Sequence, residues 1–278
     1  AGSDEGTSGV ARRRRIGHRG PPHSALLNLR VFEGQPASTN RILLSIGEFQ
    51  PDGVCATIWA HSPTSAHMYL PPYFKCDDPS VAARLMREHP LASLITVDDA
   101  GLPFVSHLPL HLREQGEGAF TLLGHVARPN PQWRHLQARP RAVVSFLGPH
   151  GYLSPQFYPD LARVPSWNYL AVHCTVGARL IEHAEVHDKD ALLKQLIGDH
   201  EPAYAQQWKD LGTDFQPMLL AGIVACELTV ERWEGKLKLN QHRPESHAAM
   251  HAAYAAGTTD EQALARWMET LGMATGSS

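Results

Sequence analysis

The chain has 278 residues, enough for one large or two small domains, and hydrophobic residues make up 43% of it. A formal net charge of −3 provides no bulk attraction to nucleic acid, so charge does not support DNA as a partner. No apolar run is long enough to span a bilayer, and no secretory signal is visible. These features predict a cytoplasmic protein that has no membrane partner. The cysteines form no CxxC pair, so we expect buried free thiols at Cys55, Cys76, Cys174 and Cys226.

The segment 1–67 differs in character from the rest of the chain. It is rich in Gly, Ser, Arg and Pro at its start and has no sustained periodicity, which favours disorder. The run Arg12–Arg15 is either part of a solvated tail or a nucleic-acid-binding arm. The first methionine is Met68. Our hypothesis is that the natural reading frame starts there, and that residues 1–67 are an upstream or non-native extension.

From residue 68 onward, the hydrophobic patterns predict short strands, hairpin turns and helices. Asp78 followed by Pro79 marks the start of a first helix, and Pro90 ends it. The predicted strands are 91–98, 102–114, 119–127, 141–148, 164–183 and 222–235. The predicted helices are 79–89, 130–138, 187–200, 201–211, 244–257 and 258–272, with Asn130 and Thr259 as caps. This order favours an α+β fold that is mainly β, in which an antiparallel sheet closes into a barrel with helices outside.

The strand predicted over 164–183 has two unlike faces, because side chains alternate along a strand. One face is mostly apolar and typical of a core. The other face carries rings and hydrogen-bonding groups without a permanent charge, namely Trp167, Tyr169, Ala171, His173 and Thr175. Such a face meets a ligand, a partner subunit or a covering helix.

The sequence GHVARPNPQW, residues 124–133, places a strand end directly before a helix start. Helical N–H groups are exposed at such a junction, and Arg128 precedes it with a side chain suited to phosphate. His125 lies three residues earlier on the strand. Together with Asn130, these residues form a candidate anion site. The alternative is an ordinary surface arginine and a structural cap.

Two further segments concentrate polar groups. In SHLPLHL, residues 106–112, one strand face carries His107, Pro109 and His111. Because no acidic or cysteine ligand accompanies them, and because Pro109 removes a ladder donor, we favour a ligand at a bulge over a metal. The segment WEGKLKLNQHR, residues 233–243, is either a site for phosphate or a polar ring system, or a basic surface loop. Its polar residues are Lys236, Lys238, Asn240, Gln241 and Arg243.

Motifs of nucleophilic and nucleotide-binding enzymes are missing from the sequence. There is no GxSxG, no GxxxxGK[ST] and no GxGxxG.

Four ordered segments resemble the PaiB-like family of FMN-binding negative transcriptional regulators: MYLPPYF, GHVARPNPQW, VPSWNYLAVH and GIVACELTVERWEGKLKLNQHR. The resemblance runs from Met68 to the C-terminal helices. It implies one domain over 68–278, an FMN-binding split barrel related to the pyridoxamine-phosphate-oxidase-like fold, with peripheral and C-terminal helices. Members of that broader fold are typically homodimers that hold flavin at the subunit interface.

The resemblance also assigns expected roles to residues. Arg128 and Asn130 would hold the FMN phosphate, and His107, Pro109 and His125 would line the same pocket. Trp167, Tyr169 and His173 would meet the flavin ring, the partner subunit, or both, unless a helix covers them as a second core layer. The expected flavin or phosphate contacts after the last strand are Asn240, Gln241 and Arg243.

Three functions follow from this resemblance. The first is a flavin-binding negative transcriptional regulator. The second is a flavin-dependent oxidoreductase that acts on a small molecule, since the cofactor itself supplies redox chemistry. The third is a dimeric binding module that has lost the flavin.

Overall fold

A computed structural model describes residues 67–274 of the chain, except 117, 161, 182–185 and 212–214. The predictions about the segment 1–66, including its disorder, its arginine run and Cys55, lie outside the described residues. Cys76, Cys174 and Cys226 are buried free thiols, as predicted.

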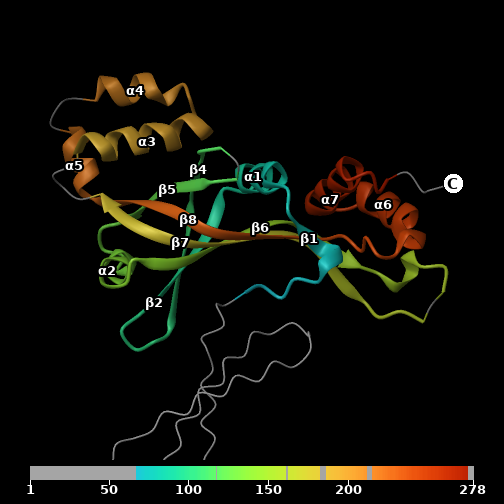
Figure 1. The fold of residues 1–278 in the computed structure, drawn as a ribbon. Helices are drawn as coiled ribbons and strands as arrows, with labels where there is room; N and C mark the ends of the chain where they lie inside the picture. The colour runs from blue at the N-terminus through green and yellow to red at the C-terminus, as the bar shows by residue number, and fades with distance from the viewer. Residues whose placement is uncertain (1–66, 117, 161, 182–185, 212–214, 275–278) are drawn as a thin grey trace, which may run out of the picture. The chain divides into compact units, whose positions relative to one another are not determined.

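A single antiparallel sheet forms the centre of the described part (Figure 1). Along the sheet the strands follow the order β3-β2-β6-β7-β8-β5-β4, and β1 pairs with β8. The strands are β1 (Lys75–Cys76), β2 (Leu91–Val97), β3 (Pro103–Pro109), β4 (His111–Glu114), β5 (Phe120–Ala127), β6 (Arg141–Leu153), β7 (Ser166–Ile181) and β8 (Ile223–Lys238). This arrangement confirms the predicted antiparallel β-architecture.

The sheet closes into a barrel through β3 and β4, which stand at the two ends of the strand order. Only Leu110 separates these two strands in the sequence. Pro109 cannot donate a ladder hydrogen bond, and the Leu110 N–H donates instead to the Pro90 carbonyl at 3.0 Å. The strand predicted over 102–114 is therefore two strands, and its break falls at the proline expected to mark an edge or bulge.

The barrel core follows from the alternation of side chains along the long strands. On β7, Leu170, Val172, Cys174 and Val176 point inward and are buried, as the sequence pattern predicted. The helix α1 (Pro79–Glu88) packs against this core, where Leu85 leaves no room for a side chain at Gly148. The carboxylate of Asp78 accepts a hydrogen bond from the Ser80 N–H at 2.8 Å, which confirms the predicted cap.

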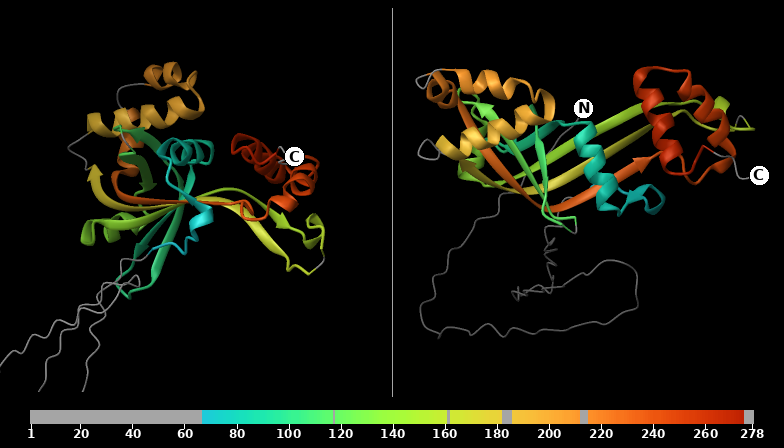
Figure 2. Two further views of the ribbon diagram at one scale, coloured as in Figure 1. Left: turned by 45° about the vertical axis from the view of Figure 1, so that its right-hand side comes forward. Right: turned by 90° about the horizontal axis from the view of Figure 1, so that it is seen from above.

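The other helices lie outside the barrel. They are α2 (Gln132–Ala138), α3 (Val186–His200), α4 (Tyr204–Asp210), α5 (Phe215–Ala221), α6 (His247–Ala255) and α7 (Thr259–Thr270). Three short 3-10 helices span Pro72–Phe74, Pro155–Phe157 and Pro244–Ser246. Figure 2 shows α3–α5 at one end of the sheet and α6 and α7 at the other. Leu192 and Leu196 of α3 pack on Leu123, Ile181 and Ala225, which covers the outer side of the sheet there. No helix in the described ranges is both apolar enough and long enough to cross a membrane.

Several predicted boundaries were wrong. The strand predicted over 141–148 ends later, at Leu153, because β6 continues to pair with β7 past a bulge between Leu147 and His150. The segment 233–243 is not simply a loop, since Lys236 and Lys238 belong to β8. The cap of α7 is Thr258, whose hydroxyl and Glu261 form a capping box, so the predicted cap is one residue late. The helix after Asn130 begins at Gln132.

Candidate functional site

A row of polar residues crosses the outer face of the barrel. Residues directly opposite each other in neighbouring strands share a face, and the register places five such residues in line. They come from β3, β2, β6, β7 and β8, respectively, and are His107, Ser93, Ser145, His173 and Glu234. We call this set the outer polar row. Ser93 Oγ lies 3.0 Å from His107 Nδ1, so at least this pair is hydrogen-bonded.

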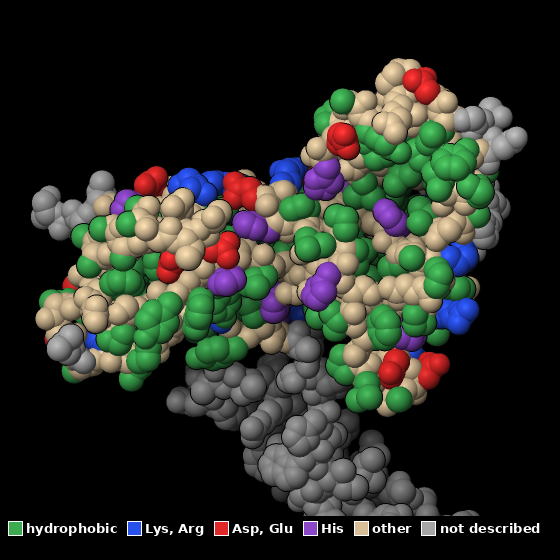
Figure 3. Space-filling view, turned by 180° about the vertical axis from the view of Figure 1, so that it is seen from behind, with side chains coloured by type: hydrophobic (Ala, Val, Ile, Leu, Met, Phe, Trp, Pro, Cys, Tyr) green, Lys and Arg blue, Asp and Glu red, His purple; other side chains and the backbone are tan. Residues whose placement is uncertain are grey.

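Exposed apolar side chains flank the outer polar row. Leu91 is 66% exposed and Leu147 is 56% exposed, while Val105 and Val143 are exposed on the other side of the row. Histidine and hydrophobic side chains also intermingle across the face seen from behind in Figure 3. Contiguous apolar surface of this kind typically marks a binding site or a subunit interface.

Two lysines and a tyrosine adjoin the row. The Tyr169 ring lies between Lys236 and Lys238, whose Nζ atoms are 5.3 and 5.7 Å from its centroid. Burial, and secondly the charge of Lys236, lowers the pKa of Lys238. The Lys238 Nζ donates to Ser166 Oγ at 2.7 Å, and the Lys236 Nζ donates to the Tyr69 carbonyl at 2.9 Å. The cluster combines an aromatic surface with two cations, which suits an anionic group attached to a ring.

The segment at the start of the described part contacts the row at Glu234. Burial alone would raise the pKa of this carboxyl, but the Met68 N–H and His67 offset it and hold the pKa below its ordinary value. The Met68 nitrogen is 3.1 Å from Oε2, and His67 Nδ1 is 3.0 Å from Oε1. Opposite Glu234, burial lowers the pKa of His173. The row therefore holds a carboxylate next to an imidazole that favours its neutral form.

The residues predicted at the β5–α2 junction lie together, but outside the outer polar row. His125 Nδ1 is buried and has no hydrogen-bond partner within the described ranges. Arg128 donates from Nε to the Ala221 carbonyl at 3.1 Å and from Nη2 to the Ile223 carbonyl at 3.2 Å. The junction is thereby connected to the start of β8.

Asn130 has contacts on two sides. Its side-chain oxygen accepts from the Gln132 N–H at 2.9 Å, and its amide donates to Ser106 Oγ at 2.9 Å. It therefore ties the start of α2 to β3.

The remaining predicted residues lie in four places. His107, Tyr169 and His173 are on the outer face, and Pro109 is at the break after β3. Trp167 is 53% exposed at the far end of β7, with its ring 5.6 Å from that of His150.

The fourth place is the turn that follows β8. Asn240, with a φ of 64°, donates to Ser246 Oγ, and Gln241 accepts from the Leu239 N–H. Arg243 Nη1 is 3.9 Å from Glu245. Gln241 also donates to the Leu237 carbonyl of β8, so the described contacts of both amides stay within this turn and the end of the strand before it.

Sequence reasoning missed Ser93, Ser145 and Glu234 as members of the row. The sequence offers one indication of them: each is a polar residue inside a predicted strand, as Ser93 is in LASLITV and Ser145 is in RAVVSFL. The part of the chain that the structure describes contains no group of three or more His, Cys, Asp or Glu side chains able to hold a metal ion.

A family model described as "Putative FMN-binding domain" matches residues 68–232. The chain belongs to this family. The match begins at the methionine where the sequence resemblance begins, and it covers β1–β7 and the first part of β8. The family membership confirms the resemblance identified from the four sequence segments.

Several known proteins are similar to this chain. The chain is 31% identical over 179 residues to "Protease synthase and sporulation protein PAI 2" of Bacillus subtilis, which covers 64% of this chain and 84% of that protein. It is 27% identical over 200 residues to "Uncharacterized protein AN0679" of Emericella nidulans, covering 58% and 80%, respectively. Among solved structures, the flavocytochrome Anf3 from Azotobacter vinelandii aligns with a TM-score of 0.49 and 14% identity, over 60% of this chain and 71% of that chain.

The side chains on the outer face fit the cofactor in the family description. The row provides hydrogen-bonding groups, and its apolar flanks provide surface for a flat ring system. Lys236 and Lys238 lie on the same face, and Arg128 lies at the β5–α2 junction, so two groups of cations are available for a phosphate.

Proposed function

We propose that this chain binds FMN on the outer face of its barrel and acts as a cytoplasmic, PaiB-type negative transcriptional regulator. The observation that carries the proposal is the family match over residues 68–232. The matched region includes β2, β3, β6 and β7, which contribute four members of the outer polar row. The exposed face and the family match thus coincide in one part of the molecule.

In this proposal the residues of the chain position the cofactor. The flavin ring lies along the outer polar row, where Ser93, His107 and His173 face its polar edge, and apolar flanks contact its faces. Tyr169 and the two lysines beside it, or Arg128 with Asn130, hold the phosphate. Bound FMN would supply one- or two-electron redox chemistry.

A second copy of the chain completes the site in this proposal. Leu91, Leu147 and Val105 leave an apolar surface exposed beside the row, and such a surface is stabilised when a partner removes it from water. The family resemblance implies a homodimer, and the exposed flanks support it. Trp167 and the turn at Asn240–Arg243 would then face the partner subunit or its flavin.

The regulatory role rests on the family resemblance. The net charge of −3 offers no bulk attraction to DNA, so repression through a metabolite or a protein partner is compatible with the sequence. The alternative is a flavin-dependent oxidoreductase. Bleaching of bound flavin by NAD(P)H followed by reoxidation in air would support the enzyme. Salt-sensitive, sequence-selective retention of promoter DNA would support the regulator.

The first experiment measures flavin in the purified protein. We expect oxidised-flavin absorbance as isolated or after FMN is added, with one FMN per chain. Lys238→Gln tests the lysine cluster and Arg128→Gln tests the β5–α2 junction. The variant that removes the phosphate anchor should bind FMN about tenfold more weakly or worse, because a charge-assisted hydrogen bond contributes about 1.5–3 kcal/mol.

The matched control is Lys194→Gln. Lys194 pairs with Asp190 on the exposed side of α3, so this variant should retain the original FMN affinity. A colourless protein that ignores added FMN would overturn the proposal. If both test variants bound FMN as tightly as the control, neither Lys238 nor Arg128 would hold the phosphate.

A further inference from the structure

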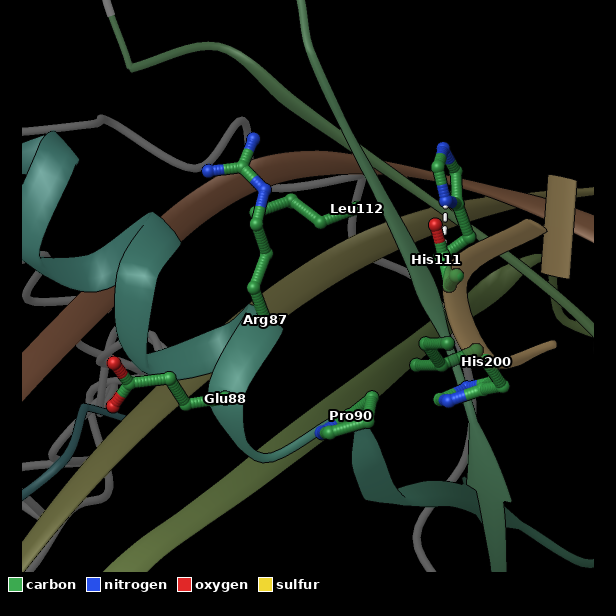
Figure 4. Close-up of a pocket in the computed structure, with 8 residues that line it drawn as sticks. Arg87, Glu88, Pro90, His111, Leu112 and His200 are labelled. Carbon is green, nitrogen blue, oxygen red and sulfur yellow. Dashed lines mark hydrogen bonds and ion pairs between the residues drawn. The ribbon is translucent and has the colours of Figure 1, made fainter. Parts of the chain in front are cut away.

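A separate hollow lies between α1, β4 and the last turn of α3. Its volume is about 370 Å³, within the range of about 300–1,000 Å³ that is usual for small-molecule pockets. Leu110 and Leu112 line it and are almost fully buried, and Pro90 adds a third apolar side chain. The polar residues of the lining are Arg87, Glu88, His111, Asp199 and His200 (Figure 4).

Both carboxylates of the lining already have partners within the chain. His111 Nδ1 lies 2.6 Å from Asp199 Oδ2, the contact drawn as a dashed line in Figure 4. The Arg84 Nε donates to Glu88 Oε1 at 2.7 Å. Both carboxylates are therefore engaged within the chain, which leaves fewer of their lone pairs for a cationic ligand in the hollow.

In contrast, the lining has hydrogen-bond donors that are not used within the chain. The Arg87 guanidinium contacts Glu114 through one nitrogen, and a guanidinium has five N–H donors. The contact with Asp199 uses Nδ1 of His111, so His111 is not counted among the free donors. His200 makes no hydrogen bond or ion pair within the residues that the structure describes. Figure 4 shows the Arg87 guanidinium and the His111 ring on either side of the hollow.

We propose that this hollow binds a small monocarboxylate that has an apolar body. The carboxylate accepts hydrogen bonds from Arg87 and from a ring N–H of His200, and the apolar body lies against Leu110, Leu112 and Pro90. Glu88 and Asp199 disfavour a ligand with more than one negative charge, since each additional charge meets a carboxylate at close range. The site lies apart from the outer polar row, so the proposal does not depend on FMN binding.

Isothermal titration calorimetry on the full chain tests this assignment. The probes are phenylacetate and isovalerate, with phenylacetamide, isovaleramide and inorganic phosphate for comparison. The variants are Arg87→Gln and His200→Gln, and the matched control is Arg141→Gln, whose arginine pairs with Glu231 elsewhere on the barrel. Thermal unfolding of each variant reports whether it is folded.

We expect at least one of the two acids to bind more tightly than its amide by about tenfold or more, because the amide lacks the charge that Arg87 recognises. The Arg87→Gln variant should bind that acid more weakly by a similar factor, and the Arg141→Gln variant should bind it with unchanged affinity. If Arg87→Gln does not fold, a weaker affinity in His200→Gln serves as the positive result. The assignment is overturned if acids and amides bind equally, if neither binds, if only phosphate binds, or if the folded test variants retain full affinity.

Discussion

At the scale of single residues, burial determines which histidines resist protonation. It lowers the pKa of His125 below the ordinary value of about 6.5. Below that pH the unfolded chain takes up a proton at this residue more readily than the folded chain does. The free energy of unfolding should therefore decrease as the pH falls from about 7 towards 5.

His125→Gln should make this pH dependence shallower. The measurement is the urea unfolding midpoint at several pH values, compared with that of the unchanged protein. Burial also lowers the pKa of His89 and His173, so part of the dependence should remain in the variant. If the unfolding midpoints of the two proteins changed with pH in parallel, protonation of His125 would not contribute to the pH dependence of stability.

At the scale of elements, the closure of the barrel depends on Gly124 of β5. A Cβ atom there would lie 2.5 Å from Leu110 Cδ2 and 3.2 Å from Leu108 Cδ1, and both leucines are buried. Gly124→Ala should lower the free energy of unfolding by about 1–3 kcal/mol through overpacking. Urea denaturation followed by circular dichroism measures this change.

Gly198→Ala is the matched control for the same chemical change. Gly198 lies in α3, and an added Cβ atom would have no neighbour within 4 Å. Alanine should therefore stabilise this helix by about 0.5–1 kcal/mol. If both substitutions changed the free energy of unfolding in the same direction, tight packing at Gly124 would not be the cause of the first effect.

The elements also show where sequence reasoning succeeds and where it stops. Local signals located α1 and β7, because the Asp78–Pro79 cap and the alternation at 168–176 depend only on neighbours in the chain. The sequence pattern predicts that the last strand ends at residue 235, with a ligand site or a basic surface loop beyond it, whereas β8 continues through Lys236 and Lys238. Yet the alternation of Glu234, Lys236 and Lys238 with Gly235, Leu237 and Leu239 is itself a strand pattern, and it could have been recognised.

The outer polar row could not be predicted in the same way. Ser93, Ser145 and Glu234 meet His107 and His173 only through strand register, which connects residues far apart in the chain. The sequence did identify His173 and the neighbouring Tyr169 from the polar and aromatic face of one strand, and His107 from the polar positions of another.

At the scale of the whole molecule, the exposed flanks of the row should control association. Leu147→Glu adds a charge to a side chain that is already 56% exposed, so the single chain should still fold. We expect this variant to be monomeric and to bind FMN more weakly than the unchanged protein, because a buried charge opposes the proposed interface. Analytical ultracentrifugation with and without FMN provides the test.

Met218→Glu serves as the comparison, since Met218 is also exposed but belongs to α5. This variant should associate as the unchanged protein does. If the Leu147→Glu variant kept both the assembly mass and the flavin affinity of the unchanged protein, the interface would lie elsewhere.

The continuity of β3 and β4 across Leu110 has a consequence for self-assembly. Unpaired strand borders recruit other chains into aggregates, and proteins usually protect such borders with charges, prolines or covering segments. Here one stretch of backbone supplies both borders of the sheet: in the described residues β3 pairs with β2 and β4 pairs with β5, each along one side. The prolines at the two ends of β3 and the charged Arg113 and Glu114 of β4 are the kind of protection that keeps such borders from adding a strand of another chain.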